Sequence, residues 1–208
     1  MATTTFTGAV RSQGGFTSVS KNSSTGAFTT LSSISSTGVS SFDANTMAVE
    51  AGTGITGGTG TIYRSSVQRV GGIITTRILI DLTGLRSTAS GDIIGVDGTS
   101  NVCHIGQITA ARNGTILTGS MECFEAPAGG DPDINVHSAT EGTGVEDGAI
   151  SSLTETLLVD AGDATLGSKV YFTAVPAADE FLYLTLGATT DADYTAGKLF
   201  IELMGYEA

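Results

Sequence analysis

Apolar residues along the chain alternate with polar ones or gather in short runs, and Gly, Pro or Asp separates each run from the next. From residue 46 onward this pattern predicts strands, because β-branched residues favour pleated sheet. Turn signals at short, regular spacing are typical of a sandwich or a barrel. The clearest predicted strand covers residues 73–82, and further predicted strands start at Thr61 or cover 93–96, 155–160, 169–175, 180–187 and 197–204.

Residues 101–126, NVCHIGQITAARNGTILTGSMECFEA, predict a β-hairpin, because Asn113 followed by Gly114 is a strong turn signal between two alternating runs. With a three-residue turn, Cys103 would lie opposite Cys123. A two-residue turn would shift the register by one and break that pairing. The sequence leaves the two registers open.

Two segments after this predicted hairpin differ from the strand pattern. Residues 126–149 are polar and rich in Gly, and they predict a long loop, which in a compact domain is usually functional or lies at an interface. Residues 149–158 place Ile150, Leu153 and Leu157 at helical spacing, so a short helix is expected there.

Residues 1–45 form a Ser/Thr/Gly-rich tract with isolated apolar side chains, most of them three to six residues apart. The tract is too sparse in apolar residues for a core and too apolar for a plain linker. It predicts an extended N-terminal arm that places Phe6, Phe16 and Phe28 as anchors on a neighbouring molecule. Packing onto the chain's own domain, or a partly disordered tail, are the alternatives. Residues 46–208 then form one globular all-β domain, an antiparallel sandwich, jelly-roll-like fold or barrel.

Composition and charge narrow the possible partners. The chain has 208 residues, a net charge of −12, and 14% charged residues, against about 25% in an average globular protein. The negative charge argues against direct binding to nucleic acid or to an anionic membrane surface. Residues 122–208 hold sixteen acids against Lys169 and Lys198, whereas earlier residues are close to neutral. This asymmetry indicates either ordered docking, with Arg64 and Arg69 as docking charges on a strand, or a solvated face that aids solubility.

The segment AGTGITGGTG contains Gly52, Gly54 and Gly57 in the spacing G-x-G-x-x-G. A dinucleotide loop needs a buried strand before these glycines and a helix after them. The preceding residues make a weak strand, and Gly71 and Gly72 would break a following helix. We therefore interpret the glycines as turn residues that join the arm to the body, and expect no nucleotide cofactor.

Other side chains with possible chemistry do not form a recognisable catalytic set. Cys103 and His104 would point to opposite faces of a strand, and no Ser lies in a nucleophile elbow. The cysteines are expected to be buried and reduced, with a disulfide as the alternative. The acidic pairs Asp131 with Asp133 and Asp191 with Asp193 are expected to form turns, with calcium binding as the alternative. We expect no enzyme activity, catalytic residue, metal or cofactor.

The first residues, MATTTFTGAV, lack the charged and apolar regions of a secretory signal, and no apolar run reaches the ~18 residues of a membrane span. Synthesis and assembly in a cytoplasm are expected, without a membrane partner.

Several sequence segments resemble proteins encoded by marine tailed phages, including cyanophages and pelagiphage-like relatives. These segments are MATTTFTGAVRSQGGF, GTIYRSSVQRVGGIITTRILIDLTGL, GDIIGVDGT, ITAARNGTI, EAPAGGDPDINVHSATEGTGVEDGAI and AADEFLYLTLGATTDADYTAGKLFIELMGY. The resemblance covers most of the chain and involves no catalytic motif. It implies a virion structural protein, specifically a capsid decoration or cement protein assembled in the bacterial host cytoplasm.

That resemblance implies the major capsid protein as partner, and a position on the outer capsid surface. Self-association, most simply as a homotrimer, is expected because decoration proteins often occupy local threefold axes. The alternative is a tail or fibre component that binds the host surface, although the chain has no internal repeat and no Trp.

Overall fold

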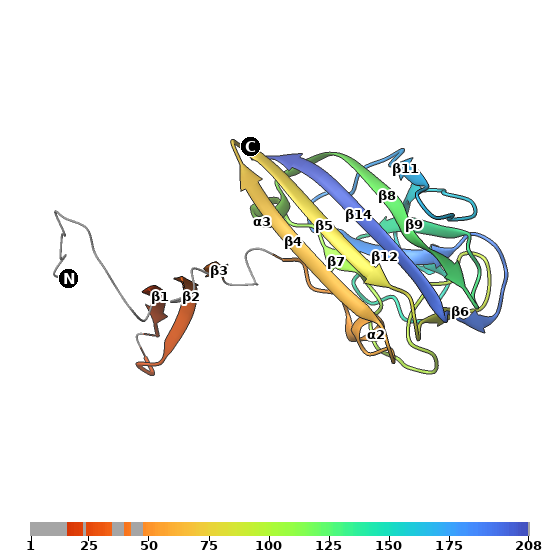
Figure 1. The fold of residues 1–208 in the computed structure, drawn as a ribbon, viewed down its shortest axis with the longest axis horizontal. Helices are drawn as coiled ribbons and strands as arrows, with labels where there is room; N and C mark the ends of the chain where they lie inside the picture. The colour runs from red at the N-terminus through yellow and green to blue at the C-terminus, as the bar shows by residue number, and fades with distance from the viewer. Residues whose placement is uncertain (1–15, 23, 35–39, 43–47, 208) are drawn as a thin grey trace. The chain divides into compact units, whose positions relative to one another are not determined.

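The computed structural model describes residues 16–22, 24–34, 40–42 and 48–207, and it divides the chain into two compact units, Met1–Met47 and Ala48–Ala208. The first unit contains a three-stranded antiparallel sheet in the order β1-β2-β3 (Figure 1). Its strands are β1 (Phe16–Lys21), β2 (Phe28–Ile34) and β3 (Ser40–Phe42).

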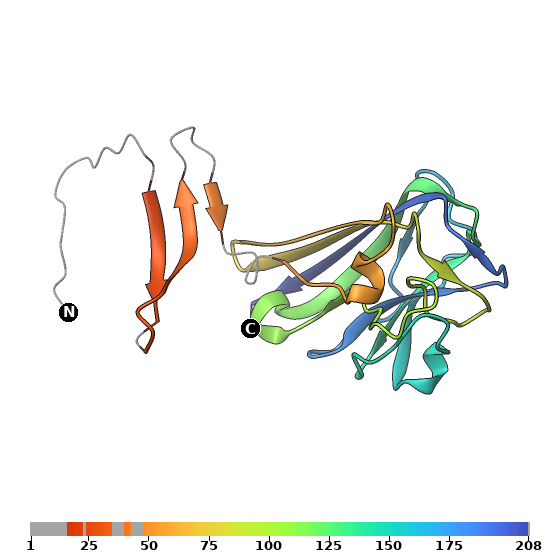
Figure 2. The same ribbon diagram turned by 90° about the horizontal axis from the view of Figure 1, so that it is seen from below.

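The second unit, called the body below, is built from two antiparallel sheets that pack together (Figure 2). The five-stranded sheet has the order β11-β8-β14-β5-β4, and its strands are β4 (Ile62–Val70), β5 (Ile73–Asp81), β8 (Thr115–Ala128), β11 (Lys169–Tyr171) and β14 (Ala196–Tyr206). The four-stranded sheet has the order β10-β9-β12-β7, and its strands are β7 (Gly106–Gln107), β9 (Ile134–Ala139), β10 (Glu155–Val159) and β12 (Phe181–Leu186).

Short elements complete the body. A two-stranded sheet pairs β6 (Arg86–Ser87) with β13 (Ala192–Asp193). The helical segments are single turns: α2 (Thr53–Thr56), α3 (Ala110–Asn113) and the 3-10 turn η1 (Ile150–Ser152). The prediction of an all-β fold and of a sandwich is confirmed, whereas the strand order does not establish a jelly roll.

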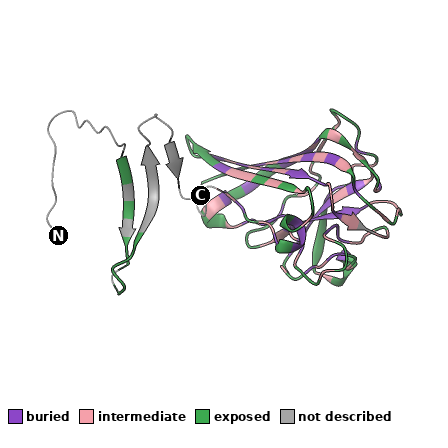
Figure 3. Cartoon of the chain, turned by 60° about the horizontal axis from the view of Figure 1, so that its bottom comes forward, coloured by how far each residue is buried: buried purple, intermediate pink, exposed green. Residues whose placement is uncertain are grey.

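Period-two alternation explains the long strands. In β14 the side chains of Leu199, Ile201 and Leu203 are buried, while the residues between them are at least partly exposed. Figure 3 shows buried and partly exposed positions alternating as bands along the strands of the body. In β5 the side chains of Ile74, Ile78 and Ile80 are buried in the same core. Successive side chains of a strand point to opposite faces, so one face of this sheet builds the core and the other faces outward.

The β4–β5 hairpin has a two-residue turn made of Gly71 and Gly72, with φ of 60° and 84°. Two consecutive residues with positive φ are typical of a type I′ turn, whose twist matches that of the flanking strands. The turn fixes the register that pairs Val70 with Ile73 and, along the hairpin, Ile62 with Asp81.

Four sequence expectations about the fold are wrong. Residues 93–96 form no strand and make only isolated bridges, such as that of Ile93 with Thr185. Residues 101–126 form no hairpin, because α3 occupies the expected turn and β8 pairs with β14 and β11. Residues 126–149 are not a loop throughout, since they contain β9 in the middle of the four-stranded sheet. Residues 149–158 form η1 and then β10 instead of one short helix, because β10 pairs with β9.

The reason for the missing hairpin is long-range. The Asn113 side chain is fully buried, with Nδ2 donating to Thr76 Oγ1 at 2.7 Å and Oδ1 accepting from the Thr109 backbone N–H at 2.9 Å. Thr109 also caps α3, because its Oγ1 accepts from the Arg112 N–H at 3.3 Å. Contacts to a distant strand thus override a local turn signal.

Candidate functional site

The outer face of the five-stranded sheet is uncovered by any other described part of the body and lies toward the viewer in Figure 1. We call it the open face. Its residues follow from the strand register and alternation: Ile62, Arg64, Ser66, Gln68 and Val70 of β4, Ile73, Thr75, Arg77, Leu79 and Asp81 of β5, Lys198, Phe200, Glu202, Met204 and Tyr206 of β14, Thr118, Ser120, Glu122 and Phe124 of β8, and Lys169 and Tyr171 of β11.

Large apolar side chains remain exposed on the strands of this sheet. Val70 is 76% exposed and Tyr171 is 66% exposed, and the others are Ile62, Ile73, Leu117, Phe124, Met204 and Tyr206. Val70 lies opposite Ile73, and Ile73 lies opposite Tyr206, so these side chains form one row across the hairpin and β14. A contiguous exposed apolar area with polar groups around it is typical of an interaction surface.

Aromatic packing joins β8 and β14 at the other end of the open face. The rings of Phe124 and Phe200 are stacked, with centroids 5.1 Å apart and planes inclined by 9°. On the neighbouring strand β11, Lys169 Nζ lies 5.9 Å from the ring centroid of Tyr171, two residues along the same strand. These contacts hold flat ring surfaces toward solvent, where a partner can cover them.

The charges on the open face are mostly neutralised within it. Arg77 Nε pairs with Glu202 Oε2 at 2.8 Å, and Arg77 Nη1 donates to Gln68 Oε1 at 3.0 Å. The remaining pairs are Lys198 with Glu125, Lys198 with Asp81 at 3.4 Å, and Lys169 with Glu122 at 3.4 Å. Each cross-strand pair of opposite charges stabilises the sheet by a fraction of a kcal/mol, about 0.2–1, and also leaves the face nearly neutral.

Of the two arginines expected as docking charges, Arg64 lies on the open face and Arg69 does not. Arg64 Nη1 donates to its neighbour's carbonyl, that of Tyr63, and forms no ion pair with the residues that the structure describes. Arg69 lies on the other face of β4, pairs with Glu207 at 2.9 Å and donates to the carbonyls of Ala111 and Arg112. Its guanidinium therefore fastens the end of β4 to α3 and to the residue after β14.

The expected arm anchors are partly described. Phe6 lies outside the described residues. Phe16 in β1 is 46% exposed, and Phe28 in β2 is 67% exposed. Val19, also in β1, is 47% exposed. Lys21 Nζ lies 5.6 Å from the ring centroid of Phe28, so a cation covers one side of that ring.

The glycine motif has a packing role. A Cβ on Gly52 would lie within 3.0 Å of the Val102 carbonyl, and a Cβ on Gly54 would lie within 3.0 Å of Cys103 Sγ and of backbone oxygens of residues 101–102. The Gly52 N–H donates to the His104 carbonyl, and the Gly54 N–H donates to the Val102 carbonyl. The glycines thus let two backbone segments touch, a reason that differs from the expected turn chemistry.

The cysteines and histidines form no nucleophile–base pair among the described residues, although Cys103 and His104 are neighbours in the sequence. Cys103 and Cys123 are buried and unbonded, and burial raises the pKa of the Cys103 thiol to about 12. Burial also lowers the pKa of His104, whose ring lies 5.0 Å from that of Phe181. His137 Nδ1 lies 2.8 Å from Glu155 Oε2. At neutral pH the Cys103 sulfur therefore remains a thiol and is a poor nucleophile.

No family model, curated protein or solved structure matches this chain. The candidate site therefore stands on its own geometry. Within residues 16–22, 24–34, 40–42 and 48–207, no group of three or more His, Cys, Asp or Glu side chains is arranged to hold a metal ion. In the same ranges, no helix has the length and apolar character to cross a membrane.

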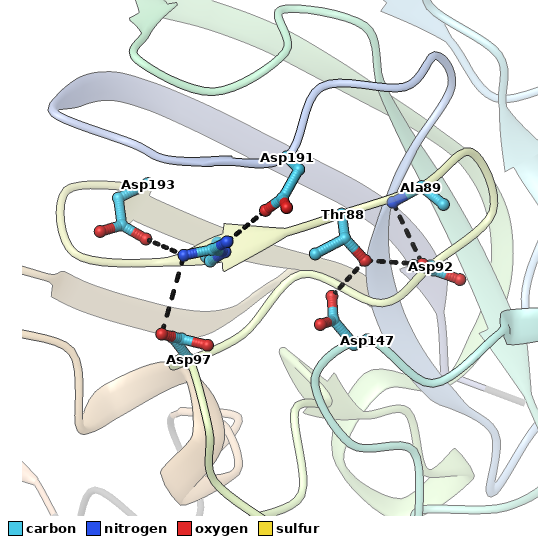
Figure 4. A network of polar contacts seen from close by, with 8 residues as sticks. Thr88, Ala89, Asp92, Asp97, Asp147, Asp191 and Asp193 are labelled. Atoms are coloured by element: carbon cyan, nitrogen blue, oxygen red, sulfur yellow. Dashed lines mark hydrogen bonds and ion pairs between the residues drawn. The ribbon is translucent and has the colours of Figure 1, made fainter.

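The acidic turns mostly serve to fix loops. Asp191 binds Arg86, and Asp97 and Asp193 lie 3.8 and 3.6 Å from the same guanidinium (Figure 4). Thr88 Oγ1 donates to Asp147 Oδ1 at 2.9 Å in the adjoining network. Asp131 Oδ1 accepts from the Asp133 backbone N–H at 3.0 Å, which confirms the expected turn role for that residue.

Glu146 borders this acidic network without a partner for one oxygen. Glu146 is only 8% exposed, and its Oε1 has no hydrogen-bond partner among the described residues. Burial, with further contributions from Asp147 and Asp97, raises the pKa of Glu146 from 4.5 to about 7. In the folded state Glu146 therefore keeps its proton up to about pH 7, whereas in the unfolded chain it loses the proton near pH 4.5.

We expect Glu146→Gln to stabilise the protein at pH 8 and to have little effect at pH 4.5. Because the pKa of Glu146 is higher in the folded state than in the unfolded chain, the wild type loses stability as pH rises from about 4.5 to about 7. The glutamine side chain does not ionise, so the variant does not lose this stability. The gain at pH 8 should be roughly 1–3 kcal/mol, measured by urea unfolding at several pH values. Glu50→Gln removes an exposed carboxylate and is the control. A pH-independent difference between Glu146→Gln and the wild type would contradict the expectation.

Sequence reasoning missed most of the open face. Its signal was present in residues 198–206, KLFIELMGY, where apolar residues occupy both strand parities. Leu199, Ile201 and Leu203 fill the core, while Phe200 and Met204 face outward. A strand that is apolar on both sides needs cover on both sides, which predicts either a buried sheet or a docking surface.

Proposed function

We propose that the protein is a virion structural protein that binds the outer surface of a bacteriophage capsid and cements neighbouring major capsid subunits. The observation that carries the proposal is the separate N-terminal sheet with its exposed apolar side chains. A three-stranded sheet needs a packed hydrophobic face for stability, yet Phe16, Val19 and Phe28 are all exposed. A partner surface that covers them would supply the missing packing.

Two further observations support the proposal. The likeness of several sequence segments to proteins of marine tailed phages gives the class of assembly. The acidic charge of the body outside the five strands suits a surface that faces solvent, since net charge keeps crowded proteins apart. A cement protein is present in many copies, so the modest affinity of each arm adds up across the shell.

The mechanism is mechanical. Each N-terminal sheet binds a capsid subunit through apolar contacts, and the bodies lie over the outer surface of the shell. Bridging copies raise the cost of separating neighbouring subunits, because several contacts must break together. Shells that carry the protein therefore withstand higher internal pressure or temperature than bare shells.

The test is co-sedimentation of the full chain with expanded empty capsids. We expect Phe16→Ser with Phe28→Ser to lower the affinity at least tenfold, because two aromatic contacts of about 1–2 kcal/mol each are lost. Leu166→Ser with Leu157→Ser is the matched control, since it removes two exposed apolar side chains from the body. The control should bind as the wild type does.

Three results would contradict the proposal. Equal binding of the Phe16/Phe28 variant and the wild type would show that the N-terminal arm does not bind the capsid through these side chains. Equal loss in the control would show that general hydrophobicity drives binding. Absence of binding by the wild type, together with a copy number per virion far below that of the major capsid protein, would favour the tail or fibre alternative.

A further inference from the structure

The open face is large enough to form an interface. Strands β4 and β5 have nine residues each, which at about 3.3 Å per residue gives a length of about 30 Å. Five strands about 4.8 Å apart span about 20 Å, so the face measures roughly 500–600 Å². Two such faces together bury about 1,000–1,200 Å², which lies just below the range of about 1,200–2,000 Å² for stable interfaces and meets the minimum of about 1,000 Å² for a specific one.

Charge is distributed unevenly between this sheet and the rest of the body. The five strands carry Arg64, Arg69, Arg77, Lys169 and Lys198 against four acids. All other residues of Ala48–Ala208 carry sixteen acids against Arg86 and Arg112. Two copies that approach through any strongly acidic surface bring like charges into contact, whereas two open faces are nearly neutral and add no repulsion at the contact itself.

The arrangement of charges on the open face also permits burial against a second copy. Arg77, Lys169 and Lys198 already have carboxylate partners on the same face, so pairing leaves these ions compensated. Arg64 lies on β4, the edge strand of the sheet, where its guanidinium can stay hydrated at the rim. The row of Val70, Ile73 and Tyr206 supplies apolar surface whose removal from water stabilises the pair.

We propose that the open face is the surface through which two copies of this chain pair, sheet against sheet, about a twofold axis. A surface that meets its own counterpart forms an isologous contact, which closes at two subunits. The pairing departs from the homotrimer expected from the sequence, and it is independent of the capsid assignment because it uses only residues of the body.

The test measures the mass of the full chain by sedimentation velocity and light scattering. We expect a dimer for the wild type at micromolar concentration, and a monomer for Val70→Glu with Met204→Glu. The matched control is Leu166→Glu with Val175→Glu, which adds the same charge elsewhere on the body at similar exposure. Val70 and Met204 are 76% and 41% exposed, and Leu166 and Val175 are 74% and 42% exposed.

Salt gives a second readout. Added NaCl should strengthen the dimer, because the acidic remainder of the two bodies repels across the pair and salt screens that repulsion. If the glutamate variant has a lowered melting temperature, Val70→Ser with Met204→Ser repeats the test without added charge. Unchanged secondary structure by circular dichroism accompanies each expected dissociation.

Several outcomes would overturn the proposal. These are a wild-type monomer at the highest soluble concentration, a face variant that remains dimeric, or a control variant that dissociates as readily. A stable trimer that the face substitutions disrupt would retain the surface but refute the twofold pairing. Failure of capsid binding with an intact dimer would refute the cement proposal alone.

Discussion

Gly54→Val is expected to destabilise the body by at least about 4 kcal/mol, a large part of the roughly 5–15 kcal/mol that stabilises a typical domain. Gly54 is buried in α2, and a Cβ there would lie within 3.0 Å of Cys103 Sγ and of the Asn101 carbonyl oxygen. Two of the nearest atoms are backbone oxygens, which a rotamer change cannot move. Valine also carries two methyl groups beyond Cβ, so relief requires the 101–103 segment to separate from α2.

Thermal unfolding followed by circular dichroism measures the effect, with Thr53→Val as the control. Thr53 neighbours Gly54 in the same turn and is exposed, so the same side chain there should change stability by less than about 0.5 kcal/mol. A cooperative Gly54→Val transition within a few degrees of the wild type would show that the 101–103 segment is pliable and that the glycines are not required for packing.

Asn113→Leu should cost about 3 kcal/mol of folding stability although leucine has a similar size. The substitution leaves the Thr109 N–H without its acceptor and the Thr76 hydroxyl without its partner, both beside a fully buried position. A buried donor that loses its partner costs about 1–3 kcal/mol, and two polar groups are affected here. The loss also loosens the start of β8, because α3 leads directly into that strand.

Denaturant unfolding of Asn113→Leu and of Asn101→Leu tests this expectation. Asn101 has an exposed side chain, so its replacement should be close to neutral. The double variant Thr76→Val with Asn113→Leu should recover part of the loss, because the hydroxyl that lost its partner is then removed as well. Equal stability of Asn113→Leu and Asn101→Leu would show that the hydrogen bonds of the buried Asn113 side chain do not stabilise the fold.

The parts of the fold that could be predicted from sequence are those that local pattern determines. The strand 73–82 was identified from its β-branched residues, and it is β5, with the boundary off by one residue. The strands at 155–160, 180–187 and 197–204 are β10, β12 and β14. Each is a run with turn residues on both sides, so neighbouring residues alone specify it.

The parts that failed depend on contacts between distant residues. Strand β9 contains Asn135, His137 and Ser138, and its surroundings are rich in Gly, so its composition resembles a loop. It is a strand because β10 and β12 pair with it on both sides. A strand buried on both faces shows no alternation, and the His137 side chain meets its partner, Glu155, only in the folded sheet.

The candidate site shows the same division. Arg64 was predicted at an exposed strand position and lies there. Arg69, five residues further along the same strand, instead forms an ion pair with Glu207, the last residue that the structure describes. The parity of a strand follows from sequence, whereas the identity of its neighbours requires the strand order. The open face as a whole became visible only once β4, β5, β14, β8 and β11 were placed side by side.

The strand order of the five-stranded sheet has a consequence for synthesis. Its middle strand, β14, is the last strand described, and it separates β5 from β8, so the edge of each strand that faces β14 stays unpaired until residues 196–206 are made. Sheets with such distant pairings fold slowly, because a long loop must close before any contact rewards it. On the ribosome the long strands β5 and β8 therefore remain with unpaired edges until β14 emerges, and chaperones that bind extended apolar segments have that interval in which to act.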